Sequence, residues 1–320
     1  MNEFLHSQIE YLLVLQNFRE LTGGLLDGFF STITMFGEIV VPMMIIALMY
    51  WCVNSKTGTF MLWNWSVGTI FCEILKSTFC IYRPWILDSR IHPVDSAFKM
   101  AGGYSFPSGH SQTAVSVWGG IAYCLKNKIF TLFMILLIIL IGFSRNYLGV
   151  HTPQDVLAAL FVAFVLLFAT DKVLKWEEKK KNRDIVILIG AILLCGLLMW
   201  YEYTKVYPLD YADGALIVDP AHMRLYAFPK IGLMLGAFIG WFLDKRFLNF
   251  DGSNGTPAEK AVRFLVGIIC MMCFSKYGTI VWGKFFGEQT SMFLATFLPA
   301  VFLTFIYPLI VTKITEKMKR

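Results

Sequence analysis

Residues 129–145 read IFTLFMILLIILIGFSR, and residues 154–171 read QDVLAALFVAFVLLFATD. A helix needs about 20 mostly apolar residues to cross a bilayer, so each stretch is close to the length of one crossing. The segment that joins them, NYLGVHTP, is polar and short. The two stretches therefore predict a pair of membrane-spanning helices joined by a tight loop.

The composition of the whole chain supports this prediction. Of its 320 residues, 57% are hydrophobic and 16% are charged, and the mean hydropathy is +0.61. These values are too apolar for a soluble globular chain, because the surplus apolar surface has to face lipid. We predict an all-α fold, a polytopic transmembrane bundle of about nine spans. The expected spans lie near residues 30–53, 58–80, 109–125, 129–145, 154–171, 185–203, 225–243, 262–283 and 289–312.

Basic residues between the expected spans indicate which side of the membrane each connection faces. Connections rich in Lys and Arg stay on the cytoplasmic side, and here they alternate with connections that are poorer in these residues. The basic positions are Lys56, Lys126, Lys128 and the basic residues within 172–183, 245–263 and 313–320. They account for the net charge of +6, so we expect no nucleic-acid partner. The remaining connections are expected on the extracytoplasmic side.

The polar run WEEKKKNRD at residues 176–184 is the sharpest break in composition. Residues 1–28 alternate apolar and polar positions, which is typical of an amphipathic helix in the membrane interface. Residues 29–175 are expected to form the core, and residues 176–320 a C-terminal unit of about four spans. Residues 204–223 are expected as a solvated loop on the outer face, and a cover over the site is the alternative.

Three glycines recur every four residues in the C-terminal unit, at Gly232, Gly236 and Gly240. This spacing places them on one helix face, where another helix backbone can approach closely in lipid. We predict that the partner helix belongs to the same chain; dimerisation is the alternative.

The first polar cluster is Lys76-x6-Arg83-Pro84, at the end of the second expected span. Residues seven apart on a helix point in nearly the same direction, so Lys76 and Arg83 are expected on one face, and Pro84 ends the helix. A lysine inside a span costs roughly 2.5 to 3.5 kcal/mol. Two interpretations remain, an ion pair with Glu73 and a clamp for phosphate oxygens.

The second polar cluster is YSFPSGHS at residues 104–111, just before the third expected span. Pro, Ser and Gly before an apolar run predict a helix start, whose free N–H groups bind anions without a side-chain charge. His110 falls in the first turn, where it can protonate an alkoxide leaving group. A helix cap beside a surface histidine is the alternative.

The third polar cluster is Ser144-Arg145-x5-His151-x3-Asp155. Pro153 suits the first turn of a helix, which puts Asp155 one turn after His151 on the same side. A carboxylate there holds one imidazole nitrogen as a donor and leaves the other free to attack phosphorus. The alternative is a capping aspartate beside an interfacial histidine.

Together the three clusters supply three cations, two histidines and one carboxylate at span ends on one expected face. This set suits a dianionic phosphoryl group, which would offset the cost of holding cations near lipid. No cluster of carboxylates, or of Cys and His at ligand spacing, lies near them in the sequence, so we expect no metal and no cofactor.

The ordered set Lys-x6-Arg-Pro, Pro-Ser-Gly-His and Ser-Arg-x5-His-x3-Asp resembles the type 2 phosphatidic acid phosphatase superfamily, which also includes vanadium-dependent haloperoxidases. The resemblance covers residues 76–155 directly and implies a phosphatase-like helical core over about 30–175. It implies that His151 is a nucleophile that forms a phosphohistidine, oriented by Asp155, and that His110 is the general acid. The implied phosphate-binding residues are Lys76, Arg83, Ser108, Gly109 and Arg145.

The resemblance implies a metal-independent hydrolase of a phosphorylated lipid. Family members act on phosphatidate, phosphatidylglycerophosphate, polyprenyl diphosphates and sphingoid base phosphates, and the sequence does not choose among them. Short loops and an outward-facing site are typical of a bacterial inner-membrane enzyme that recycles a polyprenyl diphosphate. A lipid phosphotransferase using the same residues, and a non-enzymatic lipid transporter, are the alternatives.

Overall fold

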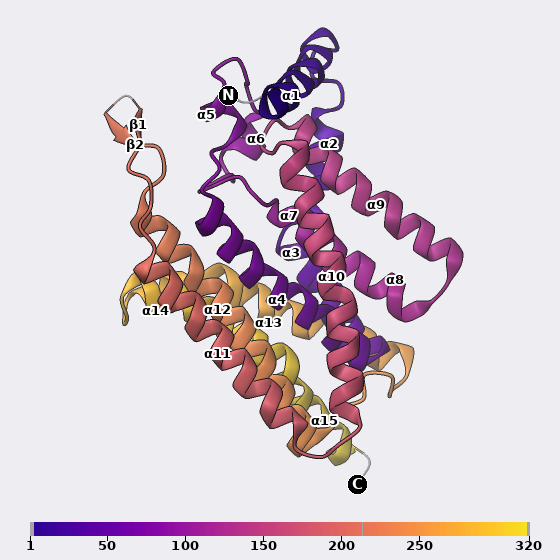
Figure 1. The fold of residues 1–320 in the computed structure, drawn as a ribbon. Coiled ribbons are helices and arrows are strands. Elements are labelled where there is room, and N and C mark those ends of the chain that lie inside the picture. The colour runs from indigo at the N-terminus through magenta and orange to yellow at the C-terminus, as the bar shows by residue number, and fades with distance from the viewer. Residues whose placement is uncertain (1–2, 213, 319–320) are drawn as a thin grey trace. The chain divides into compact units, whose positions relative to one another are not determined.

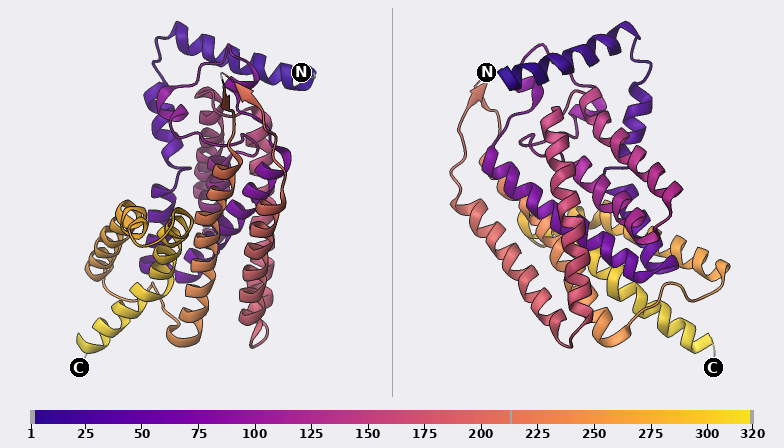
Figure 2. Two further views of the ribbon diagram at one scale, coloured as in Figure 1. Left: turned by 90° about the vertical axis from the view of Figure 1, so that its left-hand side faces the viewer. Right: turned by 45° about the vertical axis from the view of Figure 1, so that its right-hand side comes forward.

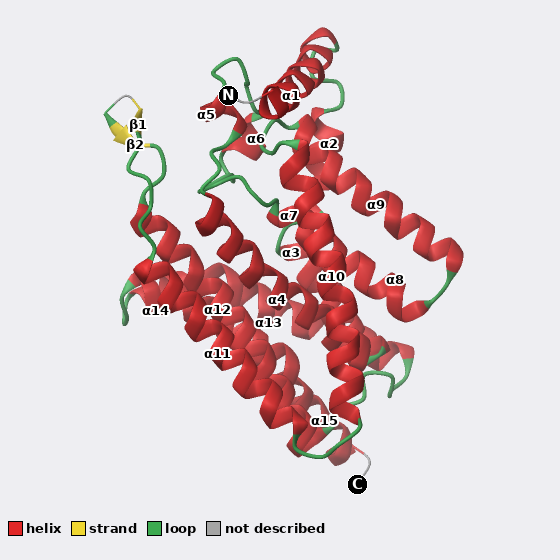
Figure 3. Cartoon of the chain, viewed as in Figure 1, coloured by secondary structure: helices red, strands yellow, loops and turns green. Residues whose placement is uncertain are grey.

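The structure is a computed structural model that describes residues 3–212 and 214–318. The described chain is helical apart from a short antiparallel pair, β1 (Tyr211–Ala212) and β2 (Ala215–Leu216) (Figure 3). The predicted all-α class is therefore confirmed. The basic tail residues Lys319 and Arg320 lie outside the described residues.

The chain divides into two compact units. Unit 1 comprises Met1–Pro42, Phe71–Leu167 and Lys205–Met223, and it contains all three polar clusters. Its elements are α1 (Glu3–Leu21), α2 (Asp27–Met35), the end of α4 (Ser55–Phe79), α5 (Pro84–Leu87), α6 (Asp95–Phe98), α7 (Gly109–Ala114), the π-helical turn η2 (Val115–Gly119), α8 (Gly120–Leu125), α9 (Lys128–Tyr147), most of α10 (Pro153–Glu178), β1 and β2 (Figure 1).

Unit 2 comprises Met43–Ile70, Phe168–Thr204 and Arg224–Arg320. Its elements are most of α3 (Val40–Leu48), η1 (Met49–Val53), the start of α4, the end of α10, α11 (Arg183–Thr204), most of α12 (Pro220–Leu243), η3 (Asp244–Leu248), α13 (Pro257–Gly283), α14 (Glu288–Val301), η4 (Phe302–Ile306) and α15 (Tyr307–Met318).

The predicted count of nine spans is wrong. Within residues 3–212 and 214–318, six helices are long and apolar enough to cross a membrane, or seven if one pair of helices bent by 44° counts as a span. The bent pair is Asp27–Met35 with Val40–Val53. The six helices are Lys128–Tyr147, Pro153–Glu178, Arg183–Thr204, Pro220–Leu248, Pro257–Gly283 and Glu288–Lys317.

Two of the predicted spans account for the difference between nine and seven, and the bent pair accounts for the difference between seven and six. Helix α4 is long enough at 25 residues, but buried polar side chains such as Asn64, Glu73 and Ser77 make it too polar. The run from α7 to α8 ends at Leu125, which leaves it too short. Both helices carry polar residues that face protein, whereas a hydropathy count treats every residue as facing lipid.

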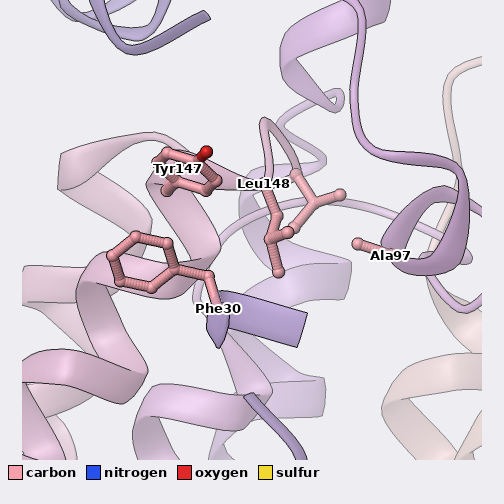
Figure 4. Close-up of a cluster of buried hydrophobic side chains, with 5 residues drawn as sticks. Phe30, Ala97, Tyr147 and Leu148 are labelled. Atoms are coloured by element: carbon pink, nitrogen blue, oxygen red, sulfur yellow. The ribbon is translucent and has the colours of Figure 1, made fainter. Parts of the chain in front are cut away.

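The apolar core of unit 1 lies beside the third polar cluster. Phe30 of α2 packs on Tyr147 at the end of α9, with ring centroids 4.4 Å apart. Leu148 and Val150, in the loop that follows α9, complete the core with Ala97 of α6 (Figure 4). This packing fixes the loop that carries His151.

Helix α1 lies across the site end of unit 1, rather than alongside α9 and α10 (Figure 2). Gln16 and Arg19 hydrogen-bond the backbone of His92, through its N–H and its carbonyl respectively. Gln8 accepts a 2.8 Å hydrogen bond from the backbone N–H of Gln154, at the start of α10. These polar contacts tie the N-terminal helix to the loops that carry the site.

The glycine stripe of unit 2 contacts another helix of the same chain, as predicted. A Cβ on Gly232 would collide with the carbonyl of Phe293, and a Cβ on Gly236 with the carbonyl of Phe297, both on α14. A Cβ on Gly240 would collide with Thr304 of η4. Helix α12 therefore approaches its neighbour at backbone distance.

Gly236→Ala is expected to lower the free energy of unfolding by about 1 to 3 kcal/mol, because the added methyl overpacks the helix contact. Its Cβ would lie 2.8 Å from that of Ala300. Thermal unfolding of the purified protein in detergent measures the effect. Gly196→Ala on α11 is the control, since a Cβ there has no neighbour within 4 Å. Equal midpoints for the two variants would contradict this account.

Candidate active site

The end of α9 and the start of α10 bring the third polar cluster together. Helix α9 ends at Tyr147, and α10 begins at Pro153, the position predicted for this proline. Gly149 has a φ of +74°, and a Cβ there would lie 3.1 Å from Cα of Pro93, so the loop requires glycine at this point. The tight turn places His151 between the ends of two helices.

His151 is buried, and both ring nitrogens have a partner. Nη1 of Arg83 lies 2.9 Å from Nε2, and Oδ2 of Asp155 lies 3.3 Å from Nδ1. A guanidinium only donates, so Nε2 is the accepting nitrogen and the ring proton belongs on Nδ1, facing the carboxylate. The predicted pairing of His151 with Asp155 is present, and the lone pair of Nε2 is directed at the cationic side of the site.

Burial, followed by the positive charges of Arg83, Lys76 and Arg145, holds the pKa of His151 well below its ordinary value of 6.5. The imidazole therefore stays neutral as the pH falls through the range in which an exposed histidine gains a proton. A neutral ring keeps the lone pair that a nucleophile needs.

Ser105 is a site residue that the sequence analysis did not assign. Its hydroxyl donates to Oδ2 of Asp155 at 2.5 Å and lies 3.3 Å from Nδ1 of His151. The backbone N–H of Thr152 donates to the same oxygen at 2.8 Å. Oδ1 of Asp155 is buried without a hydrogen-bond partner among the described residues. Ser105 and Thr152 thus fix the carboxylate that orients His151.

Arg83 is held mainly by backbone carbonyls. Its guanidinium donates to the carbonyls of Gly102 at 2.8 Å, Gly103 at 3.2 Å and Val150 at 3.0 Å, besides contacting His151. These carbonyls come from the loops before the second cluster and within the third. Arg83 therefore joins all three clusters.

Lys76 reaches the same region from a different element. Nζ donates to the carbonyls of Tyr104 at 2.8 Å and Ser105 at 3.2 Å. The prediction that Lys76 and Arg83 share one face of one helix is wrong, because α4 ends at Phe79 and Cys80 turns the chain with a φ of +49°. Arg83 instead precedes α5, where Pro84 begins the helix.

Arg145 and His110 lie on the side of the site formed by α2 and the turn after it. Nη1 of Arg145 donates to Oγ1 of Thr34 at 2.6 Å, while its buried Nε has no partner among the described residues. His110 lies within electrostatic range of Arg145 and His151. A Cβ on Gly37 would lie 2.9 Å from the carbonyl of His110, so the turn packs directly on this histidine.

The sequence analysis missed this contribution of α2, because it treated residues 30–53 as one uninterrupted span. The available signal is the pair Gly37 and Glu38, which interrupts an otherwise apolar run. The chain bends there by 44°.

Ser108 and Gly109 begin α7, as the second cluster predicts. The Ser108 side chain accepts from the backbone N–H of Ser111 at 3.4 Å, which makes it the N-cap. Its own N–H donates to the carbonyl of Asp155 at 3.0 Å. Gly109 is the first helical residue, and a Cβ there would meet nothing within 4 Å. The N-cap residue therefore connects the second cluster to the third through its backbone N–H.

The apolar helices, together with the buried Arg83, Arg145 and His151, define a multi-pass membrane protein with a site suited to phosphoryl groups. The PAP2 superfamily matches residues 58–179, which contain all three clusters. The transmembrane extension of PAP2 superfamily phosphatases matches residues 228–319. The chain belongs to the PAP2 superfamily of membrane phosphatases, as its motifs predict.

Several curated relatives have phosphatase names. A probable sphingosine-1-phosphate phosphatase of Dictyostelium discoideum is 24% identical over 73% of this chain and 56% of its own length. Phosphatidylglycerophosphatase B of Bacillus subtilis is 28% identical over 44% of this chain and 73% of its own. The undecaprenyl-diphosphatase BcrC of the same organism is 30% identical over 32% and 49%. The chain thus spans little more than half the length of the first relative, and no solved structure matches it.

Ser105→Ala is expected to reduce kcat for phosphate release by about tenfold to a hundredfold, the range for losing a hydrogen bond to a charged group. The carboxylate that orients His151 would lose one of its donors. Steady-state assays of the purified protein measure this, with Ser96→Ala at an exposed position of α6 as control. Ser105→Thr, which keeps the hydroxyl, should restore part of the rate. An unchanged kcat in Ser105→Ala would refute the role.

Proposed function

We propose that the protein hydrolyses a phosphorylated lipid through a phosphohistidine formed on His151. The observation that carries the proposal is the arrangement of the ring, with Nδ1 facing Asp155 and the lone pair of Nε2 facing Arg83. Each neighbour favours one state of the imidazole, a neutral ring with its nucleophilic nitrogen on the cationic side. A merely structural histidine has no need for this pairing.

In the proposed first step, Nε2 of His151 attacks phosphorus and the bond from phosphorus to the lipid oxygen breaks. A protonated His110 donates its proton to that oxygen as it leaves. Burial and the charge of Arg145 lower the pKa of His110 below its ordinary value, and the negative charge of the bound phosphate would raise it again. In the second step a water attacks the phosphohistidine, with His110 accepting its proton, and inorganic phosphate is released. Asp155 stabilises the positive charge that develops on His151 in the first step.

Charge stabilisation in this mechanism comes from the three basic residues. Arg83, Arg145 and Lys76 would bind the non-bridging oxygens, together with the hydroxyl of Ser108 and the backbone N–H of Gly109. Nε of Arg145, buried without a partner among the described residues, is a donor available to a phosphate oxygen. Arg83 would transfer part of its hydrogen bonding from His151 to the substrate.

We propose that the reaction needs no metal. Within the part of the chain that the structure describes, no group of three or more His, Cys, Asp or Glu side chains is arranged to hold a metal ion. Three basic side chains supply the positive charge that a metal supplies in other phosphatases. In this proposal, these side chains neutralise the charge of the phosphoryl group.

The proposed substrate class is a lipid whose phosphate or diphosphate is exposed at the membrane surface. The relatives are named for sphingosine-1-phosphate, phosphatidylglycerophosphate, lipid A 4'-phosphate and undecaprenyl diphosphate. These lipids share a phosphoryl group attached to a large apolar body. A polyprenyl diphosphate, phosphatidate and phosphatidylglycerophosphate all remain within the proposal.

We propose that residues 1–28 lie in the membrane interface beside the site. Gln8, Gln16 and Arg19, on one face of α1, hydrogen-bond the loops around the site. The exposed apolar side chains include Phe4, Val14 and Leu21, of which Leu21 is 88% exposed. A helix with one face bound to protein and apolar groups on another suits the boundary between head groups and acyl chains.

The division of the chain near residue 176 is likewise a proposal. The separate family matches to residues 58–179 and 228–319 support it. Residues 29–175 would then carry the chemistry, and residues 176–320 would supply membrane helices.

A phosphotransferase is the second candidate for this site, since the same phosphohistidine can pass its phosphoryl group to an acceptor other than water. Release of inorganic phosphate that depends on such an acceptor separates the two. A non-enzymatic lipid transporter would give no reason for Asp155 and Ser105 to orient His151.

His151→Asn is expected to abolish phosphate release from lipid phosphates, because the amide has no nucleophilic lone pair at that position. The purified protein would be assayed against phosphatidate, phosphatidylglycerophosphate, sphingosine-1-phosphate and undecaprenyl diphosphate.

Orthovanadate, which mimics five-coordinate phosphorus, should inhibit competitively, and metal chelators should leave the rate unchanged. Near-normal turnover by His151→Asn would contradict the phosphohistidine mechanism. Loss of activity in the presence of chelators would contradict metal independence.

The orientation of the site is a further part of the proposal. Lys126 and Lys128 lie at the start of α9, at the opposite end of that helix from Arg145. In unit 2, Lys245 pairs with Glu177 and Lys56 pairs with Glu178. Basic side chains therefore lie at the C-terminal end of α10. The positive-inside rule supports a cytoplasmic position for these ends and an extracytoplasmic position for the site.

Cysteine labelling tests the orientation. Lys99→Cys lies beside the site loops and Lys128→Cys at the far end of α9, and both positions are exposed. In intact cells, with the exposed Cys273 replaced, a membrane-impermeant maleimide is expected to label only the first variant. Labelling of Lys128→Cys alone would reverse the assignment.

A further inference from the structure

Residues 205–223, here called the strap, belong to neither matched region of the family. Residues 205–219 connect α11 to α12 and residues 220–223 are the first turn of α12, yet the whole strap forms part of unit 1. The sequence analysis expected a solvated loop, but Tyr207 is only 5% exposed and Met223 only 1%. Asp213 lies outside the described residues. The burial of these two side chains shows that the strap packs against the rest of unit 1.

Tyr207 is the main contact of the strap with the site. Its hydroxyl lies 2.9 Å from the hydroxyl of Ser77 on the last turns of α4. Its ring is nearly parallel to that of Tyr104, at 9° with centroids 6.3 Å apart. Tyr104, Tyr207 and Met223 form one buried cluster. Tyr207 therefore contacts two segments at once, α4 and the loop that begins the second cluster.

Asp210 makes a second attachment. Its Oδ2 accepts a 2.6 Å hydrogen bond from the hydroxyl of Tyr82, and its carbonyl accepts from the N–H of Ile217 at 3.0 Å. Burial, and then the bond to Asp210, raises the pKa of Tyr82 to about 12. The phenol therefore keeps its proton near neutral pH and can donate to Asp210.

Both segments that Tyr207 contacts also hold Lys76. Ser77 follows Lys76 directly on α4, and the Tyr104 carbonyl is the nearer acceptor of the Lys76 ammonium, at 2.8 Å. The Ser105 carbonyl is the other, at 3.2 Å, and the Ser105 N–H bonds the carbonyl of Ile81. The strap thus contacts the residue that follows Lys76 on α4. It also packs on Tyr104, whose carbonyl accepts a hydrogen bond from the Lys76 ammonium.

This placement matters because lysine is a flexible point charge with a four-carbon stem. Charge stabilisation of a transferring phosphoryl group depends on donors that are already in place. Carbonyls carried by a loop direct the ammonium only if that loop is itself fixed. The Tyr104 ring is fixed between Tyr82, at 5.6 Å between centroids, and Tyr207.

We propose that the strap positions Lys76 for phosphate binding, with Tyr207 as the positioning residue that couples α4 to the Tyr104 loop. The inference rests on the proposed function. It assigns to a segment outside the matched catalytic region a role in the charge stabilisation performed by the site.

Tyr207→Phe is the primary test, because it keeps the stacked ring and removes only the hydroxyl bonded to Ser77. We expect kcat/KM for radiolabelled phosphate release to fall about three- to tenfold, the range for one neutral hydrogen bond. Ser77→Ala removes the same bond from the other side and should give the same loss. Tyr211→Phe is the matched control, because Tyr211 is 64% exposed on the same strap.

Double variants separate positioning from general packing. In a Lys76→Ala background, Tyr207→Phe is expected to cause no further loss of kcat/KM, because the residue that it positions is absent. Equal losses in both backgrounds would overturn the inference. Thermal unfolding in detergent would accompany the kinetics, and a loss of activity that follows a lowered midpoint in both backgrounds counts against it as well.

The proposed function and this inference fail differently. If the wild-type protein releases no phosphate from any lipid phosphate, the proposed function fails and the inference with it. If the wild-type protein is active and Tyr207→Phe matches Tyr211→Phe, only the inference fails.

Discussion

The structure of unit 1 depends on the need to give basic side chains acceptors at the end of a membrane-embedded bundle. Arg83 is buried and donates to the carbonyls of Gly102, Gly103 and Val150, while Lys76 donates to those of Tyr104 and Ser105. Carbonyls without a helical hydrogen bond occur in loops and in the last turn of a helix. The irregular loops around the site therefore supply carbonyl acceptors to Arg83 and Lys76. Within a regular helix those carbonyls would be bonded to the helix backbone.

The same loops explain how one site is assembled from distant segments. The N–H of Ser108 bonds the carbonyl of Asp155, and the hydroxyl of Ser105 bonds its carboxylate. Arg83 contacts His151 directly. Each cluster is therefore held by the other two, and the nucleophile proposed here owes its orientation to both. Outside the clusters, the turn after α2 packs on His110, and the strap packs on Tyr104.

Parts of the geometry of the candidate site were predictable because they depend on local spacing. Pro153 begins α10 and places Asp155 one turn beyond His151, a relation set by helix geometry alone. The helix start at Ser108 was likewise predictable from Pro, Ser and Gly. The count of spans was not, because hydropathy along the chain does not distinguish a polar side chain facing protein, such as Glu73, from one facing lipid. The break at Phe79 was missed for a related reason, since helix periodicity alone places no turn at Cys80.

The sequence by itself determined that this is a helical membrane protein of the phosphatase superfamily, because apolar length and short motifs are properties of contiguous residues. It also determined which residues of the three motifs would meet. Only the tertiary structure decided what surrounds them, namely Ser105 on the carboxylate of Asp155, Thr34 on Arg145, and Tyr207 beside Ser77. The hydrogen bonds to Arg145 and Ser77 join residues more than a hundred positions apart in the chain. Contacts over such separations depend on how helices pack, and no periodicity in a single segment encodes them.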